Sequence, residues 1–157
     1  MIRIISVGKI KEKYLESGIK EYEKRLSKYS KLELIEVKDI PIPENQNETI
    51  FEKIKTEEGK EILSKIKDDY LIALDPKGEM LDSIAFSKKI EDINTKGKSK
   101  IAFVIGGSLG LSKEVLDRCD YKMSFSKLTF PHQLFKLILM EQIYRAYKIL
   151  NNEIYHK

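Results

Sequence analysis

Strand-like and helix-like segments alternate along the whole chain, and this alternation restricts the fold more than any other feature. Short runs of β-branched and apolar residues fit strands, and longer segments with apolar residues three or four positions apart fit helices. The predicted strands are Ile2–Val7, Leu32–Val37, Tyr70–Leu74, Ile101–Ile105 and Tyr121–Phe125. The predicted helices are Glu12–Tyr29, Glu48–Ile66, a segment from its N-cap Ser83 to Lys96, a short helix after its N-cap Ser112, and Gln133–Asn151. This pattern predicts an α/β protein with a parallel sheet and helices on both faces.

The length of 157 residues fits a single domain over the whole chain, without repeats or low-complexity tracts. The turn-forming residues Asp75–Gly78 predict a turn after the third strand, and the prolines in Asp39–Asn47 predict a loop. No apolar run is long enough to span a bilayer, and the first residues predict a strand rather than a signal peptide. We therefore expect a cytoplasmic protein that does not contact membranes. Cys119 is the only cysteine and both histidines are remote from it, so the sequence predicts no disulfide and no metal site.

Basic residues gather near both ends of the chain, with tyrosines between them, although the net charge is only +4. Basic side chains that contact phosphates, together with rings that stack on unpaired bases, are typical of RNA-binding proteins. Solvated helix faces with tyrosines half in the core fit the same pattern equally well. The tyrosines in question are Tyr14, Tyr22, Tyr29, Tyr144, Tyr147 and Tyr155.

The last predicted helix, Gln133–Asn151, is apolar over most of its circumference. A helix of this kind needs more than one surface to cover it, which we expect to be the sheet and a second subunit. The sequence therefore predicts a homodimer. The apolar residues are Leu134, Leu137, Ile138, Leu139, Met140, Ile143, Ala146, Ile149 and Leu150.

The strand Ile101–Ile105 runs directly into Gly106-Gly107, followed by a helix-start signal. Ligands of open α/β sheets bind at the carboxyl ends of the strands. If the third, fourth and fifth strands are neighbours, Leu74, Gly106-Gly107 and the segment Phe125–Phe130 form one crevice of backbone amides and apolar side chains. Such a crevice suits an adenosine-containing ligand, because the dinucleotide fingerprint and the phosphate-binding P-loop are both absent. A tight turn without a ligand is the alternative interpretation.

Four motifs of this chain resemble bacterial methyltransferases that modify N3 of a pseudouridine in 23S ribosomal RNA, which belong to the SPOUT superfamily. The resemblance covers the whole chain and implies an α/β-knot fold, in which the C-terminal segments thread into a trefoil knot. It also implies S-adenosylmethionine as the cofactor. The motifs are Ile105-Gly106-Gly107-Ser108-x-Gly110, Ser124–Gln133, Glu141-Gln142-x-Tyr144-Arg145-Ala146, and the terminal Tyr155-His156-Lys157.

Site residues follow from this resemblance position by position. Tyr155 and His156 of the C-terminal tail are the expected catalytic residues, as base and substrate contact, with Arg145 binding phosphate or the imide oxygens. In the family the tail reaches toward the active site of the partner subunit. His132 has either a catalytic role or an orienting one. The expected cofactor contacts are Leu74, Gly106, Phe125, Ser126, Lys127, Leu128, Thr129 and Phe130.

The expected function is therefore methyl transfer from S-adenosylmethionine to N3 of a pseudouridine in 23S ribosomal RNA. The chain has no appended RNA-binding domain, which favours a substrate recognised by its shape, such as the assembled 70S ribosome. One alternative is a SPOUT methyltransferase acting on transfer RNA or on another ribosomal site. A second alternative is a non-catalytic module that binds RNA or the ribosome through the same basic faces.

Overall fold

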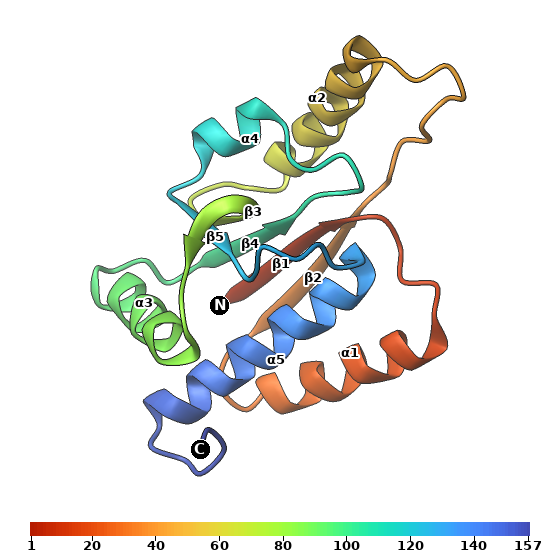
Figure 1. Cartoon of the computed structure of the whole chain (residues 1–157). Helices are drawn as coiled ribbons and strands as arrows, with labels where there is room; N and C mark the ends of the chain where they lie inside the picture. The colour runs from red at the N-terminus through yellow and green to blue at the C-terminus, as the bar shows by residue number, and fades with distance from the viewer.

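Five parallel strands form one sheet in the computed structural model, which describes residues 1–157 (Figure 1). Their order is β2-β1-β4-β3-β5, and every neighbouring pair is parallel. This arrangement confirms the predicted fold class. The trefoil knot stays a prediction from the resemblance, because strand order and register do not describe threading. The strands are β1 (Ile2–Val7), β2 (Leu32–Val37), β3 (Tyr70–Met80), β4 (Ile101–Ile105) and β5 (Tyr121–Ser124).

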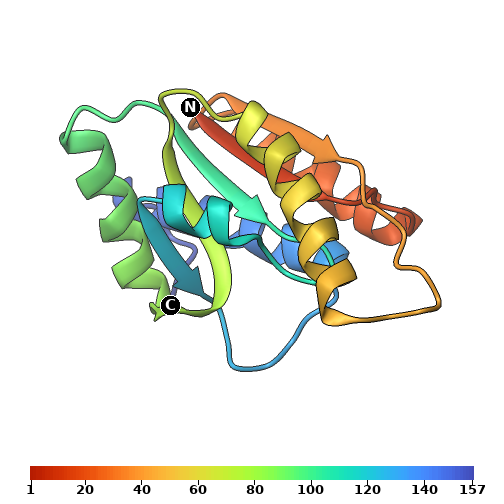
Figure 2. The same cartoon turned by 90° about the horizontal axis from the view of Figure 1, so that it is seen from above.

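Helices cover both faces of the sheet, as predicted. Figure 1 shows α2 and α4 on one face and α1, α3 and α5 on the other, and Figure 2 looks onto the face with α2 and α4. Ser112 caps α4 as expected, whereas α3 is capped by Asp82 and not by Ser83. No helix is long and apolar enough to cross a membrane. The helices are α1 (Lys13–Leu26), α2 (Glu48–Ser64), α3 (Ser83–Thr95), α4 (Lys113–Arg118) and α5 (His132–Leu150).

Alternate side chains of each strand point into two separate cores, because successive strand residues face opposite sides of a sheet. In β1, Ile4 packs with the core under α1, α3 and α5, while Ile5 packs with the core under α2 and α4. In β4, Phe103 and Val104 divide in the same way. All four side chains are fully buried, so the two central strands are apolar on both faces.

The turn predicted at Asp75–Gly78 is wrong, because β3 continues through it to Met80. Leu74 and Glu79 both pair with Met123 of β5, so the residues between them form a bulge within the strand. A Cβ on Gly78 would lie 2.6 Å from the backbone nitrogen of Met123, so only glycine fits against β5 there. Pro76 and Gly78 therefore mark a bulge that pairing with β5 holds in the sheet.

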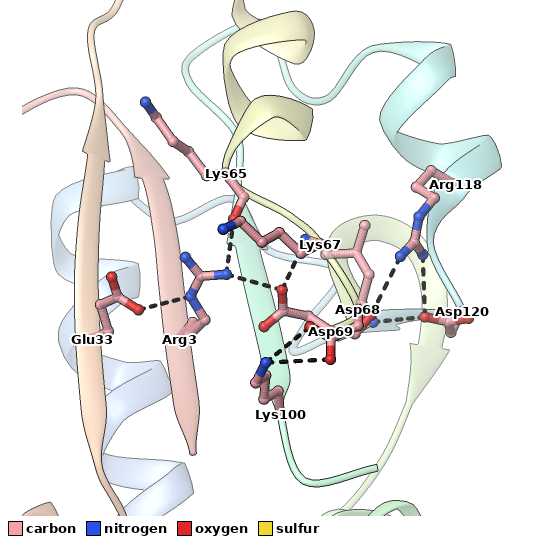
Figure 3. Close-up of polar contacts among 10 residues, drawn as sticks. Arg3, Glu33, Lys65, Lys67, Asp68, Asp69, Lys100, Arg118 and Asp120 are labelled. Atoms are coloured by element: carbon pink, nitrogen blue, oxygen red, sulfur yellow. Dashed lines mark hydrogen bonds and ion pairs between the residues drawn. The ribbon is translucent and has the colours of Figure 1, made fainter.

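Ionic contacts tie the amino ends of the strands together (Figure 3). Arg3 of β1 donates hydrogen bonds to Asp69 Oδ2 at 2.9 Å, to Glu33 of β2 at 2.9 Å and to the carbonyl oxygen of Lys65 at 2.8 Å. The side chain of Asp69 is fully buried, and its Oδ1 atom has no hydrogen-bond partner. Arg3 thus supplies the positive charge that compensates the buried Asp69 carboxylate. This ion pair lies at the amino ends of the strands, on the side of the sheet opposite to their carboxyl ends.

The last helix, α5, is partly covered within one subunit. None of its residues is exposed, because α1, α3 and the sheet pack around it. Leu134, Leu137, Ile138, Ile149 and Leu150 nevertheless keep part of their surface accessible, so the packing within one subunit does not decide whether a second subunit covers the helix. Exposed apolar side chains lie elsewhere, at Met80, Ile84 and Leu128, which are 53%, 47% and 73% exposed. The homodimer itself stays a prediction.

Candidate functional site

The largest of the cavities described here has a volume of about 560 Å³ and lies at the carboxyl ends of β3, β4 and β5. We call it the strand-end cavity. Leu74, Ile105 and Ser124 of its lining belong to β3, β4 and β5, which are direct neighbours in the sheet. The predicted meeting of these strand ends is therefore confirmed. The volume falls in the range of roughly 300–1,000 Å³ that is typical of sites for small organic ligands.

Seven of the eight residues expected to contact a cofactor line this cavity. Lys127 is the exception, since it is exposed and lies outside the lining. Asp75, which follows Leu74 at the predicted strand end, also lines the cavity, and Lys55 and Lys77 add charged groups that the sequence analysis did not identify. The seven residues are Leu74, Gly106, Phe125, Ser126, Leu128, Thr129 and Phe130.

The glycine turn after β4 closes on itself. The amide of Gly110 donates a hydrogen bond to the carbonyl oxygen of Gly107 at 3.0 Å, and Gly110 has a φ of 85°. A Cβ on Gly106 would lie 2.8 Å from the carbonyl carbon of Gly110. Position 106 therefore needs glycine for the turn itself, and the contact of Gly106 with a cofactor stays a prediction.

Aromatic packing anchors the loop Phe125–Phe130 to the start of α5. Phe125 lies 4.9 Å and Phe130 lies 6.3 Å from Phe135, measured between ring centroids. Inside the loop, the Ser126 hydroxyl accepts a hydrogen bond from the Leu128 amide at 2.9 Å. The loop is therefore fixed by aromatic packing on Phe135 and by its own internal hydrogen bond. The Leu128 side chain is exposed to solvent.

The three expected catalytic residues lie together. Arg145 Nη1 is 3.2 Å from His156 Nδ1, and the Arg145 guanidinium lies over the Tyr155 ring at 4.7 Å. Glu141 joins them, because it accepts hydrogen bonds from Arg145 Nε at 3.0 Å and from the Tyr155 hydroxyl at 3.1 Å. Burial, followed by hydrogen bonding with Tyr22 and the charge of Glu141, raises the pKa of Tyr155. Tyr155 is therefore a neutral hydrogen-bond donor here and not a base.

His156 lines a second cavity of about 460 Å³, which we call the tail cavity. This cavity lies between the start of α3, α5 and the Phe125–Phe130 loop. Met123, Phe125 and Phe130 line both the tail cavity and the strand-end cavity. Within one subunit the two aromatic rings thus stand between His156 and the expected cofactor site.

Most of the interleaved tyrosines pack against each other. Tyr144 is surrounded by the rings of Tyr22, Tyr29 and Tyr155 at centroid distances of 5.1–6.0 Å. These contacts confirm the interpretation in which the tyrosines lie half in the core. Only Tyr14 of the six is largely free, with 69% of its surface exposed.

Two carboxylates near the cavities were missed as site residues. Glu141 belongs to a motif already noted, but its link to Arg145 and Tyr155 depends on the tail folding back. Glu58 of α2 is only 8% exposed. Its spacing from Ile54 and Ile62 places it on the buried stripe of the helix, and this spacing is the signal that could have identified it.

A parallel α/β sheet with a cavity at three adjacent strand ends is typical of proteins that bind a small organic ligand or cofactor. The chain also matches the family model described as "predicted SPOUT methyltransferase" over residues 1–156. It therefore belongs to the SPOUT methyltransferase family, and it is a methyltransferase.

Curated relatives and solved structures agree with this assignment. The chain is 59% identical over 157 residues to "Ribosomal RNA large subunit methyltransferase H 1" of Clostridium perfringens (strain SM101), covering 99% of both. It is 57% identical to "Ribosomal RNA large subunit methyltransferase H" of Clostridioides difficile (strain 630), with the same coverage.

Among solved structures, a probable methylase family protein from Haemophilus influenzae Rd KW20 superimposes with a TM-score of 0.57. The two sequences are 16% identical, and the match covers 99% of this chain and 70% of that one. A probable methyltransferase from Bordetella pertussis Tohama I gives a TM-score of 0.55 at 11% identity, covering 92% and 95%. At these identities the likeness concerns the fold.

Proposed function

We propose that the chain binds S-adenosylmethionine in the strand-end cavity and transfers its methyl group to large-subunit ribosomal RNA. The observation that carries the proposal is the cavity at three strand ends, lined by seven of the residues expected to hold the cofactor. Its backbone-rich glycine turn and its apolar loop suit an adenosine group better than a triphosphate. The full-length relatives with 57–59% identity, named as ribosomal RNA large subunit methyltransferases, support the substrate.

The proposed target atom is N3 of a pseudouridine in 23S ribosomal RNA on the assembled 70S ribosome. The motifs shared with methyltransferases of this type support this choice. S-adenosylmethionine would supply a sulfonium methyl group that is already activated, so the protein must mainly align the base and handle its proton. The imide N3–H ionises about two units above neutral pH, so forming the anion costs roughly 3 kcal/mol.

Three side chains of the C-terminal region are suited to lowering this cost. Arg145 carries a permanent positive charge that stabilises negative charge on an imide oxygen. Tyr155 has a neutral phenol because its pKa is raised, and its hydroxyl would have to leave Glu141 to donate a hydrogen bond to the base. His156 adds an imidazole that lies 3.2 Å from Arg145 and lines the tail cavity. Glu141 holds Arg145 and Tyr155 in place and is a positioning residue.

A homodimer completes the proposed site, with the tail of one subunit acting at the cavity of its partner. The supporting observation is that Phe125 and Phe130 separate His156 from the strand-end cavity in its own subunit. The exposed Met80, Ile84 and Leu128 lie on the elements that border the tail cavity and offer an apolar contact surface. We expect the protein to act in the cytoplasm, where ribosomes are found.

The decisive experiment incubates the protein with labelled S-adenosylmethionine and with 70S ribosomes from cells that lack the gene. Mass mapping of the 23S RNA should find one new methyl group on a pseudouridine. Label in transfer RNA or at another ribosomal position would favour the alternative SPOUT substrates. Ribosome binding without methyl transfer or cofactor binding would instead identify a non-catalytic module.

A further inference from the structure

A third cavity, which we call the Glu58 cavity, adjoins the strand-end cavity. It has a volume of about 200 Å³ and shares Gly107, Ser108, Leu109 and His132 with the larger cavity. This volume is below the roughly 300–1,000 Å³ of sites for whole organic ligands, so it suits a group as small as one pyrimidine ring. Its remaining lining residues are Val7, Asp39, Ile40, Pro41, Ile42 and Glu58.

The charges around the Glu58 cavity exclude a phosphate. No lysine or arginine lines it, whereas Glu58 and Asp39 contribute two carboxylates that repel anions. Val7, Pro41 and Ile42 supply apolar walls. The lining therefore fits a neutral, flat ring that carries N–H donors at its edge.

Glu58 is the most informative group in this cavity. It is 8% exposed and forms no salt bridge, and its Oε2 atom would lie 3.2 Å from a Cβ on Gly107. Burial and the nearby charge of Asp39 raise the pKa of Glu58, while a backbone hydrogen bond from Ile40 opposes the rise. A buried carboxylate without a cation is costly unless a hydrogen-bond donor reaches it. The backbone N–H of Ile40 supplies one donor, and a base with an N–H group would supply a second.

Resting on the proposed function, we infer that the Glu58 cavity holds the target base and that the Glu58 carboxylate accepts a hydrogen bond from N1–H of pseudouridine. The ribose of pseudouridine is attached to C5, so N1–H occupies the position that C5–H occupies in uridine. Glu58 therefore meets a donor in pseudouridine and a C–H group in uridine. N3 faces the wall shared with the strand-end cavity, toward the methyl donor. Glu58 is thus a specificity-determining residue.

The test compares two ribosome preparations, one with pseudouridine and one with uridine at the target position. The wild-type protein should prefer the pseudouridine form by roughly tenfold or more in kcat/KM, the range expected for a hydrogen bond to a charged group. Glu58→Met removes the acceptor and should bring the ratio of the two values close to one. Glu58→Gln keeps a neutral acceptor and should give an intermediate ratio.

Glu57→Gln is the matched control, since Glu57 is the neighbouring residue on α2 but is exposed. It should leave the ratio unchanged, and all three variants should bind S-adenosylhomocysteine within a few fold of the wild type. A merely structural role for Glu58 would lower activity on both ribosomes equally and leave their ratio intact. That outcome overturns the inference.

The proposed function and this inference fail in different ways. If the wild type methylates neither ribosome, the proposed function is wrong. If the wild type methylates both equally well, methyl transfer stands and the role of Glu58 is wrong. If Glu58→Met does not fold, an unchanged ratio in Glu58→Gln overturns the inference by itself.

Discussion

The guanidinium of Arg145 donates a hydrogen bond to Nδ1 of His156 across 3.2 Å. Arginine has no acceptor atom, so Nδ1 must carry a lone pair and the proton of this imidazole must sit on Nε2. In this arrangement His156 presents an N–H donor, which suits an imide oxygen. To take the N3 proton on Nδ1, His156 must first separate from Arg145. Binding of the RNA base is the event that would supply a competing partner for the guanidinium.

Replacing Arg145 with Lys tests this arrangement. Lysine keeps the charge but loses the planar fork that contacts Glu141 and His156 together. We expect kcat to fall at least about tenfold, a loss of roughly 1.4 kcal/mol in transition-state stabilisation, with donor affinity unchanged. Single-turnover methylation and calorimetry with S-adenosylhomocysteine measure the two effects. Arg25→Lys is the control, because Arg25 also pairs with a glutamate and lies over a tyrosine ring, but on α1.

Deleting Tyr155–Lys157 should abolish methyl transfer to ribosomes and leave donor affinity within a few fold. The deletion also removes the packing of Tyr155 on Tyr144 at 5.1 Å, so we expect a loss of about 0.5–1.5 kcal/mol in stability. Denaturant unfolding measures this loss. Full activity in the truncated protein would show that the tail does not carry the chemistry.

Mixed dimers extend this test to the question of which subunit the tail serves. A truncated subunit paired with a subunit that cannot bind the donor should restore about one working site if the tail acts on its partner. The same pair should be inactive if the tail acts within its own subunit.

S-adenosylhomocysteine should stabilise the protein by about 2.7 kcal/mol at one hundred times its dissociation constant. Gly106→Val should remove this stabilisation, since its side chain collides with the backbone of Gly110 and opens the glycine turn. We expect the variant to fold, with a cost of about 1–3 kcal/mol. Gly97→Asn is the control, since Gly97 has a φ of 79° and open space around it. Thermal unfolding with and without ligand gives both quantities, and an unchanged midpoint in the wild type would contradict the cofactor assignment.

The core strands could be predicted well because the apolar residues that mark each strand are close neighbours in the sequence. Ile101–Ile105 is a continuous apolar run and Ile2–Val7 is rich in isoleucine and valine, and both strands were predicted at their observed limits. The bulge at Asp75–Gly78 was missed because Pro76 and Gly78 are also typical of turns, and only pairing with β5 keeps them in a strand. The strand order depends on such distant pairings and cannot be read from periodicity.

In the candidate site, too, features marked by neighbouring residues were predicted, and features that depend on distant contacts were missed. Seven lining residues of the strand-end cavity were predicted, whereas Lys127 was also predicted but does not line it. Glu58 was missed because the polar residues Glu57 and Lys60 around it look like a solvated helix face. The contact of Glu141 with Tyr155 was missed because it depends on the chain reversing after α5.

Glu58 should make stability depend on pH in a defined direction. Its pKa is raised in the folded protein above the ordinary value of 4.5, mainly by burial. Below pH 4.5 the carboxyl is protonated in both states and contributes nothing, whereas at higher pH it must ionise where charge is disfavoured, so stability falls as pH rises through the folded pKa. Glu58→Gln should therefore be more stable than the wild type at pH 7, and this difference should vanish toward pH 4. Denaturant unfolding across this range is the measurement, and a constant difference would contradict the expected cause.

Arg3→Met should destabilise the protein by about 3–5 kcal/mol, because it leaves the buried carboxylate of Asp69 without its cation. The control is Lys100→Met, which breaks the exposed pair with Asp68 at 3.0 Å. That change should cost no more than about 1 kcal/mol. Equal losses in urea unfolding would mean that burial of Asp69 does not set the energy of its ion pair.

The position of β1 next to the central strand β4 affects the order in which the sheet assembles during synthesis. Ile2, made at the start, pairs with Ile101, so the centre of the sheet closes only after β4 has left the ribosome. The loop Phe125–Phe130 and the tail appear later still, and pairings between such distant segments form slowly. A nascent chain therefore has neither a cofactor site nor a complete tail. The proposed cofactor site can therefore assemble only after β4 and the loop Phe125–Phe130 have been synthesised.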